Sequence, residues 1–144
     1  MSNLTVLLAE DDERQANLIT RALSQNKSVN QVIGFSNGQD VLCFLFELSI
    51  CNIPVEKYVL ILDTQLSQVS GIEILKVVKK NETIKSMPII IFSSIKDTQT
   101  MEMCYRLGCN AFINKPIDFA EFERLSMLNF LSVMQIPNTP LFQK

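Results

Sequence analysis

Five short apolar runs, each followed by a segment whose apolar residues have helical spacing, dominate this sequence. The runs cover residues 4–9, 29–35, 58–63, 89–92 and 111–114. Nearly continuous runs of Val, Ile and Leu are typical of strands that are buried on both faces. Helical spacing occurs up to about residue 24, from 37 to about 48, from 71, from about 98 to 107, and from 118 to about 134. Five such units predict an α/β domain, with a parallel sheet covered by helices on both faces.

Polar residues stand at or just beyond the ends of four of these runs. In open parallel sheets the carboxyl ends of the strands share one edge, and ligands bind in the crevice beyond it. We therefore expect these polar side chains to gather at a single site. They are Glu10, Asp11 and Asp12 after the first run, Asp63 at the end of the third, Ser93 after the fourth and Lys115 after the fifth.

The charges of these residues predict a metal ion. Several carboxylates would crowd around one lysine, and at about 4 Å each like-charge pair costs roughly 4 kcal/mol at an effective dielectric of about 20. Oxygen ligands on short loops suit Mg²⁺, which retains water ligands that a phosphoryl group can replace. Softer metals are disfavoured, because the chain has no histidine and no CxxC pair. We expect the four cysteines to be reduced thiols; they are Cys43, Cys51, Cys104 and Cys109.

The same residues permit phosphoryl transfer. A carboxylate beside Mg²⁺ and a lysine can attack an activated phosphoryl group, and Asp63 is the candidate. The metal and Lys115 would neutralise charge on the transferring oxygens. The Ser93 hydroxyl could then hydrogen-bond a phosphoryl oxygen. That bond offers a route to switching, because the new group adds about −1.5 to −2 charge and strong acceptor oxygens.

Each of these residues also has a simpler structural explanation. Asp11 or Asp12 could be a helix N-cap. Asp63 could cap a turn, and Lys115 could belong to a surface loop. It is the combination, at the ends of four separate strands, that favours a functional site.

Length and composition fit one compact domain. The chain has 144 residues, of which 47% are hydrophobic and 19% charged, so a core can form and disorder is disfavoured. We assign residues 1–135 to the domain and 136–144 to a C-terminal tail. The net charge is −2 and there is no basic block, so we expect neither nucleic acid nor a membrane as a partner. The absence of a signal peptide and of a long apolar run predicts a cytoplasmic protein.

Four motifs resemble those of the receiver domains of two-component response regulators, the CheY-like family. They are VLLAEDDE, LILDTQL, IIIFSS and FINKP. The resemblance covers about residues 4–134, which leaves no separate output domain. It implies a flavodoxin-like, doubly wound (βα)5 fold with strand order 2-1-3-4-5. It also implies a phosphoacceptor switch that catalyses only its own phosphorylation and dephosphorylation, with a histidine kinase or histidine phosphotransfer protein as the donor.

The first two motifs imply an acceptor and a metal site. Asp63 occupies the phosphoacceptor position. The resemblance implies that Mg²⁺ is held by Glu10, Asp11, Asp63 and the backbone carbonyl of Gln65. Asp12 follows the metal-binding pair, and we expect it to cap the first helix.

The last two motifs imply the switch residues, with two departures from the family pattern. Ser93 and Lys115 match the residues that bind the phosphoryl group, and the Lys115–Pro116 peptide bond is typically cis in this family. Ser93 replaces the commoner Thr and keeps the hydroxyl. Phe112 matches the switch aromatic but replaces the commoner Tyr, so it lacks a phenolic hydrogen bond.

The loop after the phosphoacceptor departs further. The usual proline and acidic residue are replaced by Ser67 and Ser70, while Gly71 is retained, so we expect a less rigid loop. Within the family, the chain resembles the small, output-free regulators that serve as partners of cyanobacterial phytochromes. Residues 51–57 and the stretch NETIKSMPII carry that resemblance.

Other functions compete with the phosphoacceptor switch. A phosphatase of the haloacid dehalogenase kind needs a second Asp two positions after the nucleophile, where this chain has Gln65. A flavodoxin-like FMN carrier needs a phosphate-binding loop after the first strand, where Glu10, Asp11 and Asp12 would repel phosphate. A receiver-like docking module that works without phosphorylation is the remaining alternative.

The last predicted helix, residues 118–134, has more apolar residues than one amphipathic face needs. A second copy of the chain could cover the excess, which predicts a homodimer strengthened by phosphorylation. The apolar residues of the tail, 136–142, could cover it equally well.

Overall fold

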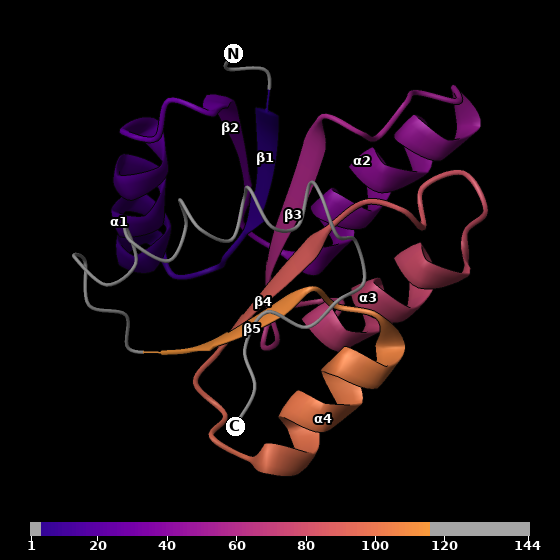
Figure 1. Cartoon of the computed structure of the whole chain (residues 1–144). Coiled ribbons are helices and arrows are strands. Elements are labelled where there is room, and N and C mark those ends of the chain that lie inside the picture. Colours follow the sequence, from indigo (N-terminus) through magenta and orange to yellow (C-terminus); the bar gives the residue numbers. More distant parts are fainter. Residues whose placement is uncertain (1–3, 116–144) are drawn as a thin grey trace.

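The computed structural model describes residues 4–115, which form a five-stranded parallel sheet of order β2-β1-β3-β4-β5 (Figure 1). The predicted α/β class and strand order are confirmed. The last predicted helix, the tail, the domain boundary after residue 135 and the Lys115–Pro116 peptide bond lie outside the described residues. The strands are β1 (Leu4–Ala9), β2 (Val29–Phe35), β3 (Tyr58–Asp63), β4 (Ile89–Ser93) and β5 (Ala111–Asn114), and the helices are α1 (Glu13–Ser24), α2 (Gly38–Ile50), α3 (Gly71–Lys80) and α4 (Thr98–Leu107).

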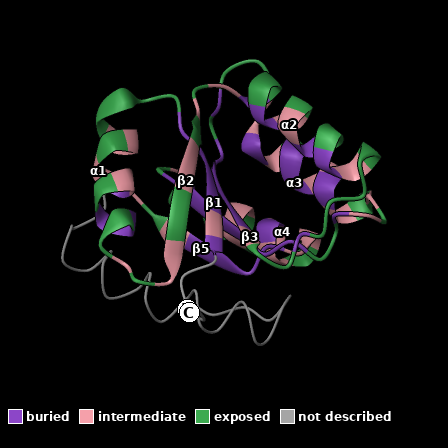
Figure 2. Cartoon of the chain, turned by 90° about the horizontal axis from the view of Figure 1, so that it is seen from above, coloured by how far each residue is buried: buried purple, intermediate pink, exposed green. Residues whose placement is uncertain are grey.

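The two faces of the sheet pack against different helices. On one face, Val6 and Leu8 of β1 lie in a cluster with the buried residues of α1. On the other face, Leu7 and Ala9 of the same strand join the buried residues of α2, α3 and α4. Figure 2 shows α1 on one side of the sheet and α2, α3 and α4 on the other. The central strands β3 and β4 are therefore almost fully buried, whereas β2 is partly exposed.

Each described helix begins at a polar side chain that caps its first turn. The capping side chains of Asp12, Asn37, Ser70 and Asp97 accept hydrogen bonds from backbone N–H groups one turn on. These bonds satisfy N–H groups that have no partner inside the helix. At the other end of α4, Gly108 has φ 112°, a left-handed conformation that ends the helix. The cap of α1, Asp12, lies directly after the acidic residues that follow β1.

Gly71 lets the start of α3 approach the end of β3 closely. Its N–H donates to the carbonyl oxygen of Thr64 at 3.2 Å. A Cβ atom at position 71 would lie 2.1 Å from the carbonyl oxygen of Asp63, which no side chain can tolerate without movement of the backbone. The absence of a side chain at Gly71 thus helps to hold the loop that carries Asp63.

None of the helices within residues 4–115 is long and apolar enough to span a membrane.

We expect Gly71→Ala to lower the free energy of unfolding by about 1–3 kcal/mol, because the added methyl group must displace the Asp63 carbonyl. Gly34→Ala is the matched control, since a Cβ atom there meets nothing within 4 Å; its effect should stay within about 0.5 kcal/mol. Urea unfolding of both variants measures the difference. Equal stability of the two variants would contradict the close approach.

Candidate functional site

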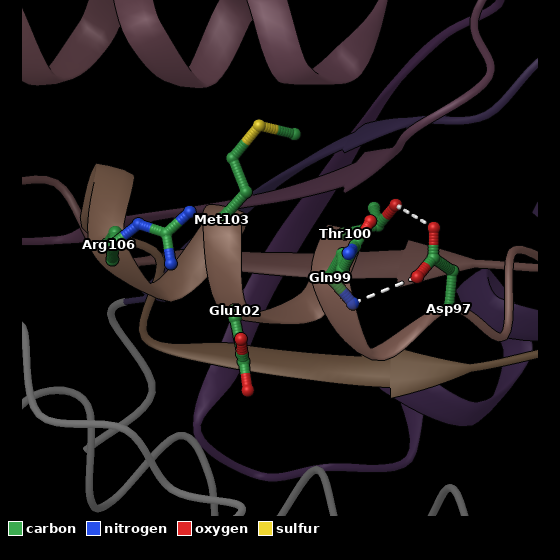
Figure 3. Close-up of a pocket in the computed structure, with 6 residues that line it drawn as sticks. All are labelled: Asp97, Gln99, Thr100, Glu102, Met103 and Arg106. Atoms are coloured by element: carbon green, nitrogen blue, oxygen red, sulfur yellow. Dashed lines mark hydrogen bonds between the residues drawn. The ribbon is translucent and has the colours of Figure 1, made fainter.

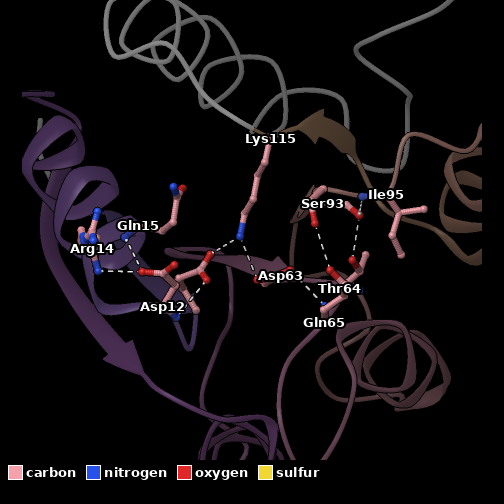
Figure 4. Close-up of polar contacts among 11 residues, drawn as sticks. Asp12, Arg14, Gln15, Asp63, Thr64, Gln65, Ser93, Ile95 and Lys115 are labelled. Atoms are coloured by element: carbon pink, nitrogen blue, oxygen red, sulfur yellow. Dashed lines mark hydrogen bonds and ion pairs between the residues drawn. The ribbon is translucent and has the colours of Figure 1, made fainter.

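The polar residues predicted to form a site gather at the carboxyl edge of the sheet (Figure 4). Glu10 follows β1, Asp63 ends β3, Ser93 ends β4 and Lys115 follows β5. The sheet places β1, β3, β4 and β5 side by side in that order, so residues far apart in the sequence meet here. Among the acidic residues after β1, Asp12 is the N-cap of α1, accepting from the N–H groups of Arg14 and Gln15, as predicted.

Lys115 joins the two buried carboxylates of this edge. Its Nζ lies 2.7 Å from Oε1 of Glu10 and 2.9 Å from Oδ2 of Asp63. The exposed fractions of the three side chains are 11% for Lys115, 2% for Glu10 and 7% for Asp63. With so little water nearby, the two carboxylates depend on Lys115 to stabilise their charges, and Lys115 depends on them.

Burial shifts the pKa values of Glu10 and Lys115 in opposite directions. Burial is the largest effect on Glu10 and raises its pKa, while the hydrogen bond from Lys115 lowers it in part. Because the pKa is raised in the folded protein, Glu10 favours the fold when it is protonated. That contribution to stability is lost as the pH rises from the ordinary pKa of a glutamate through the raised pKa. Burial would lower the pKa of Lys115, but the hydrogen bonds to Glu10 and Asp63 outweigh it and the pKa is raised overall. The ammonium group thus remains charged between its two partners.

A third carboxylate completes an acidic cluster. Oxygen atoms of Glu10, Asp11 and Asp63 all lie within 4.8 Å of one another, and Asp11 is exposed. The three carboxylates and the one ammonium of Lys115 leave two negative charges. A divalent cation would balance them, and oxygen ligands at this spacing fit Mg²⁺.

The backbone after Asp63 is directed by that carboxylate. The N–H of Gln65 donates to Oδ1 of Asp63 at 3.0 Å, so both carboxylate oxygens have partners. The side chain of Gln65 is exposed, and its Oε1 accepts a hydrogen bond from the Ser94 hydroxyl at 3.0 Å. A metal ligand role for the Gln65 carbonyl remains a prediction.

Ser93 ends β4 and Glu10 follows β1, so the two lie on opposite sides of β3, which ends in Asp63. Ser93 is fully buried, and its Oγ lies 2.8 Å from Oγ1 of Thr64. The Ser93 Oγ also accepts from the N–H of Ile95 at 3.0 Å, and the Ser93 carbonyl accepts from the N–H of Lys115 at 2.8 Å. The strand ends that carry Ser93 and Lys115 are therefore bonded directly to each other.

Comparison with known proteins identifies the family. A family model described as the response regulator receiver domain matches residues 6–125, well over half of the chain. This chain belongs to the receiver domains of response regulators. Receiver domains act in two-component signalling as phosphoacceptor switches, interact with histidine kinases or phosphotransfer proteins, and bind Mg²⁺ at an acidic pocket.

Relatives of this receiver domain are of several kinds. It is 25% identical to the probable methanogenesis regulatory protein FilR2 of Methanothrix harundinacea over 119 residues, 83% of this chain and 76% of the relative. It is 32% identical to the chemotaxis protein CheV1 of Helicobacter pylori over 116 residues, 79% of this chain but only 34% of CheV1. The chain thus spans about a third of CheV1, so the shared part is the receiver domain.

Solved structures agree on the fold. A receiver domain from Rhodospirillum rubrum has a TM-score of 0.79 and 32% identity, covering 95% of this chain and 99% of that one. The bacteriophytochrome response regulator RtBRR has a TM-score of 0.71 and 29% identity, covering 90% of this chain and 78% of that one. The phosphorylated cyanobacterial phytochrome response regulator RcpA, with a TM-score of 0.75, 21% identity and coverage of 88% and 90%, shares the fold.

Phe112, the predicted switch aromatic of the receiver domain, is buried and separate from the acidic cluster. It is 5% exposed, and its backbone N–H donates to the hydroxyl of Tyr105 on α4 at 3.1 Å. It borders a hollow of about 200 Å³ together with residues at the start of α4. A larger hollow of about 500 Å³ lies along α4 (Figure 3) and is lined by Asp97, Gln99, Thr100, Glu102, Met103 and Arg106. Neither hollow is lined by the residues of the acidic cluster.

The loop after Asp63 makes hydrogen bonds at both of the serines that replace the family's usual proline and acid. The Ser67 carbonyl accepts from the N–H of Gly38, at the start of α2, and from the N–H of Val69. Ser70 caps α3 by accepting from the N–H of Glu73. Of the two, only Ser70 bonds through its side chain, at the end of the loop where α3 starts, and a less rigid loop stays a prediction.

Thr64 is the site residue that sequence reasoning missed. It directly follows Asp63 and is 4% exposed. In the register between β3 and β4, Asp63 pairs with Phe92. The residues that follow them, Thr64 and Ser93, therefore lie side by side. The available signal in the sequence was the hydroxyl of Thr64, next to Asp63, in addition to the hydroxyl of Ser93.

We expect Mg²⁺ to stabilise the domain against thermal unfolding, by about 2.7 kcal/mol at one hundred times its dissociation constant. Asp11→Asn should abolish most of that gain. In chelator the same variant should be slightly more stable than the wild type, by less than about 1 kcal/mol, because one exposed like charge is removed.

Glu56→Gln is the matched control, since Glu56 is exposed and lies before β3, at the opposite edge of the sheet. It should keep the full response to Mg²⁺ in differential scanning calorimetry. An unchanged Mg²⁺ response in Asp11→Asn would contradict the assignment of the metal site.

Proposed function

We propose that Asp63 accepts a phosphoryl group in a Mg²⁺-dependent reaction, and that phosphorylation changes how the domain binds a partner or a second copy. The observation that supports this most is the buried pair of carboxylates that share Lys115, with a third carboxylate at the exposed side. A purely structural ion pair would need one acid for one base. The extra acids favour a site built for a cation and a phosphoryl group.

In the proposed step, a carboxylate oxygen of Asp63 forms a bond to phosphorus. The bond between phosphorus and the donor breaks, and the donor group leaves with the electron pair. Lys115, already 2.9 Å from Asp63, would pair with a phosphoryl oxygen. Bound Mg²⁺, held by Glu10, Asp11, Asp63 and the Gln65 carbonyl, would supply positive charge to the transferring oxygens.

The Ser93 hydroxyl is the proposed sensor of the new group. It would donate to a phosphoryl oxygen, and its movement would alter the space available to Phe112 on the neighbouring strand β5. The donor is proposed to be a histidine kinase or histidine phosphotransfer protein. The 29% identity to the bacteriophytochrome response regulator RtBRR suggests a bacteriophytochrome as a partner. A homodimer through residues 118–134 lies outside the described residues and stays a prediction.

Intact-mass measurement after incubation with acetyl phosphate tests the proposal. We expect one phosphoryl adduct on the wild type with Mg²⁺, none with EDTA, and none on Asp63→Asn. Asp12→Asn is the matched control, because Asn also caps helices and Asp12 serves as the α1 cap; it should be labelled like the wild type.

The absence of an adduct from the folded wild type, with acetyl phosphate and with a phosphorylated histidine kinase as donor, would contradict the proposal. That result would favour the alternative, a docking module that works without phosphorylation. An adduct that persists in Asp63→Asn would contradict the site assignment.

A further inference from the structure

Ser93, the proposed sensor hydroxyl, is already bonded within the protein. Its Oγ lies 2.8 Å from Oγ1 of Thr64 and accepts from the N–H of Ile95 at 3.0 Å. Ser93 is fully buried and Thr64 is 4% exposed, so water is poorly placed to replace either bond. A hydroxyl has one hydrogen to donate and occupies one staggered rotamer at a time. Turning Ser93 Oγ toward a phosphoryl group on Asp63 therefore breaks its bond to Thr64.

Thr64 is not free to follow Ser93. Its N–H donates to the carbonyl of Phe92 at 3.1 Å, and its own carbonyl accepts from the N–H of Gly71 at 3.2 Å. A threonine side chain is also restricted at χ1 by its branched Cβ atom. If Ser93 turns, the Thr64 hydroxyl loses its bond in a buried position, which is unfavourable.

We propose that Thr64 is a positioning residue that holds the Ser93 hydroxyl away from Asp63 in the unphosphorylated domain. The inference rests on the proposed function and concerns its regulation. The Thr64–Ser93 hydrogen bond opposes the switch, so it sets how readily the domain adopts the phosphorylated arrangement. Figure 4 shows Thr64 and Ser93 beside Asp63.

Binding of beryllofluoride, an analogue of a phosphoryl group on aspartate, measures this effect without a kinase. Thr64→Val keeps the shape of the side chain and removes the hydroxyl. Since both the resting bond and the unfavourable unpaired hydroxyl are then absent, Thr64→Val should bind beryllofluoride about threefold to tenfold more tightly than the wild type in Mg²⁺. Thr64→Ser keeps the hydroxyl and should remain within about twofold of the wild type. Fluorine NMR titration gives the affinities.

A double-mutant cycle with Ser93→Ala separates positioning from a general structural effect. Ser93→Ala alone should weaken binding. In that background Thr64→Val should give no gain, because the hydroxyl that Thr64 holds is absent. Thermal unfolding confirms that each variant is folded, and Thr64→Ala replaces Thr64→Val if the valine variant does not fold.

The outcomes distinguish the two proposals. Unchanged affinity in folded Thr64→Val, or a gain of the same size in the Ser93→Ala background, would overturn the role of Thr64 and leave Asp63 as the acceptor. A wild type that binds no beryllofluoride in Mg²⁺, or that binds it no better than Asp63→Asn, would overturn the proposed function and this inference with it.

Discussion

The ammonium group of Lys115 lies between two buried carboxylates, and the rest of the site depends on that arrangement. It connects the ends of three strands, because Glu10 follows β1, Asp63 ends β3 and Lys115 follows β5. Removing one partner from a buried ion pair costs a protein about 3–5 kcal/mol. One lysine cannot balance the three carboxylates of Glu10, Asp11 and Asp63, so the cluster keeps a net negative charge. The arrangement thus stabilises the carboxyl edge of the sheet and leaves negative charge there that a cation can balance.

A helix cap and a glycine help to position this site. Asp12 begins α1 directly after the acids of β1, and Gly71 allows α3 to start against the carbonyl of Asp63. On the far side of Asp63, the buried hydroxyls of Thr64 and Ser93 bond to each other. Asp63, the proposed acceptor, therefore lies between the charged side chains of Glu10 and Lys115 and the neutral hydroxyls of Thr64 and Ser93.

The sequence was sufficient to predict the fold and the charged part of the site. Continuous apolar runs marked the strands, and parallel strands bring their carboxyl ends to one edge, so Glu10, Asp63 and Lys115 could be placed together. The Thr64–Ser93 bond was missed, because it depends on the register between β3 and β4. The same limit applies to buried Asn110, whose side chain and backbone both bond to Ile89. Neither contact follows from local periodicity.

The proposed switch requires that the phosphoryl group resides on Asp63 and on no other carboxylate of the cluster. Borohydride reduction of the phosphorylated wild-type protein, followed by tandem mass spectrometry, tests this directly, because an aspartyl phosphate is reduced to homoserine. We expect homoserine at position 63 alone. Homoserine at position 11 or 12, or at any residue outside the cluster, with Asp63 unmodified, would contradict it.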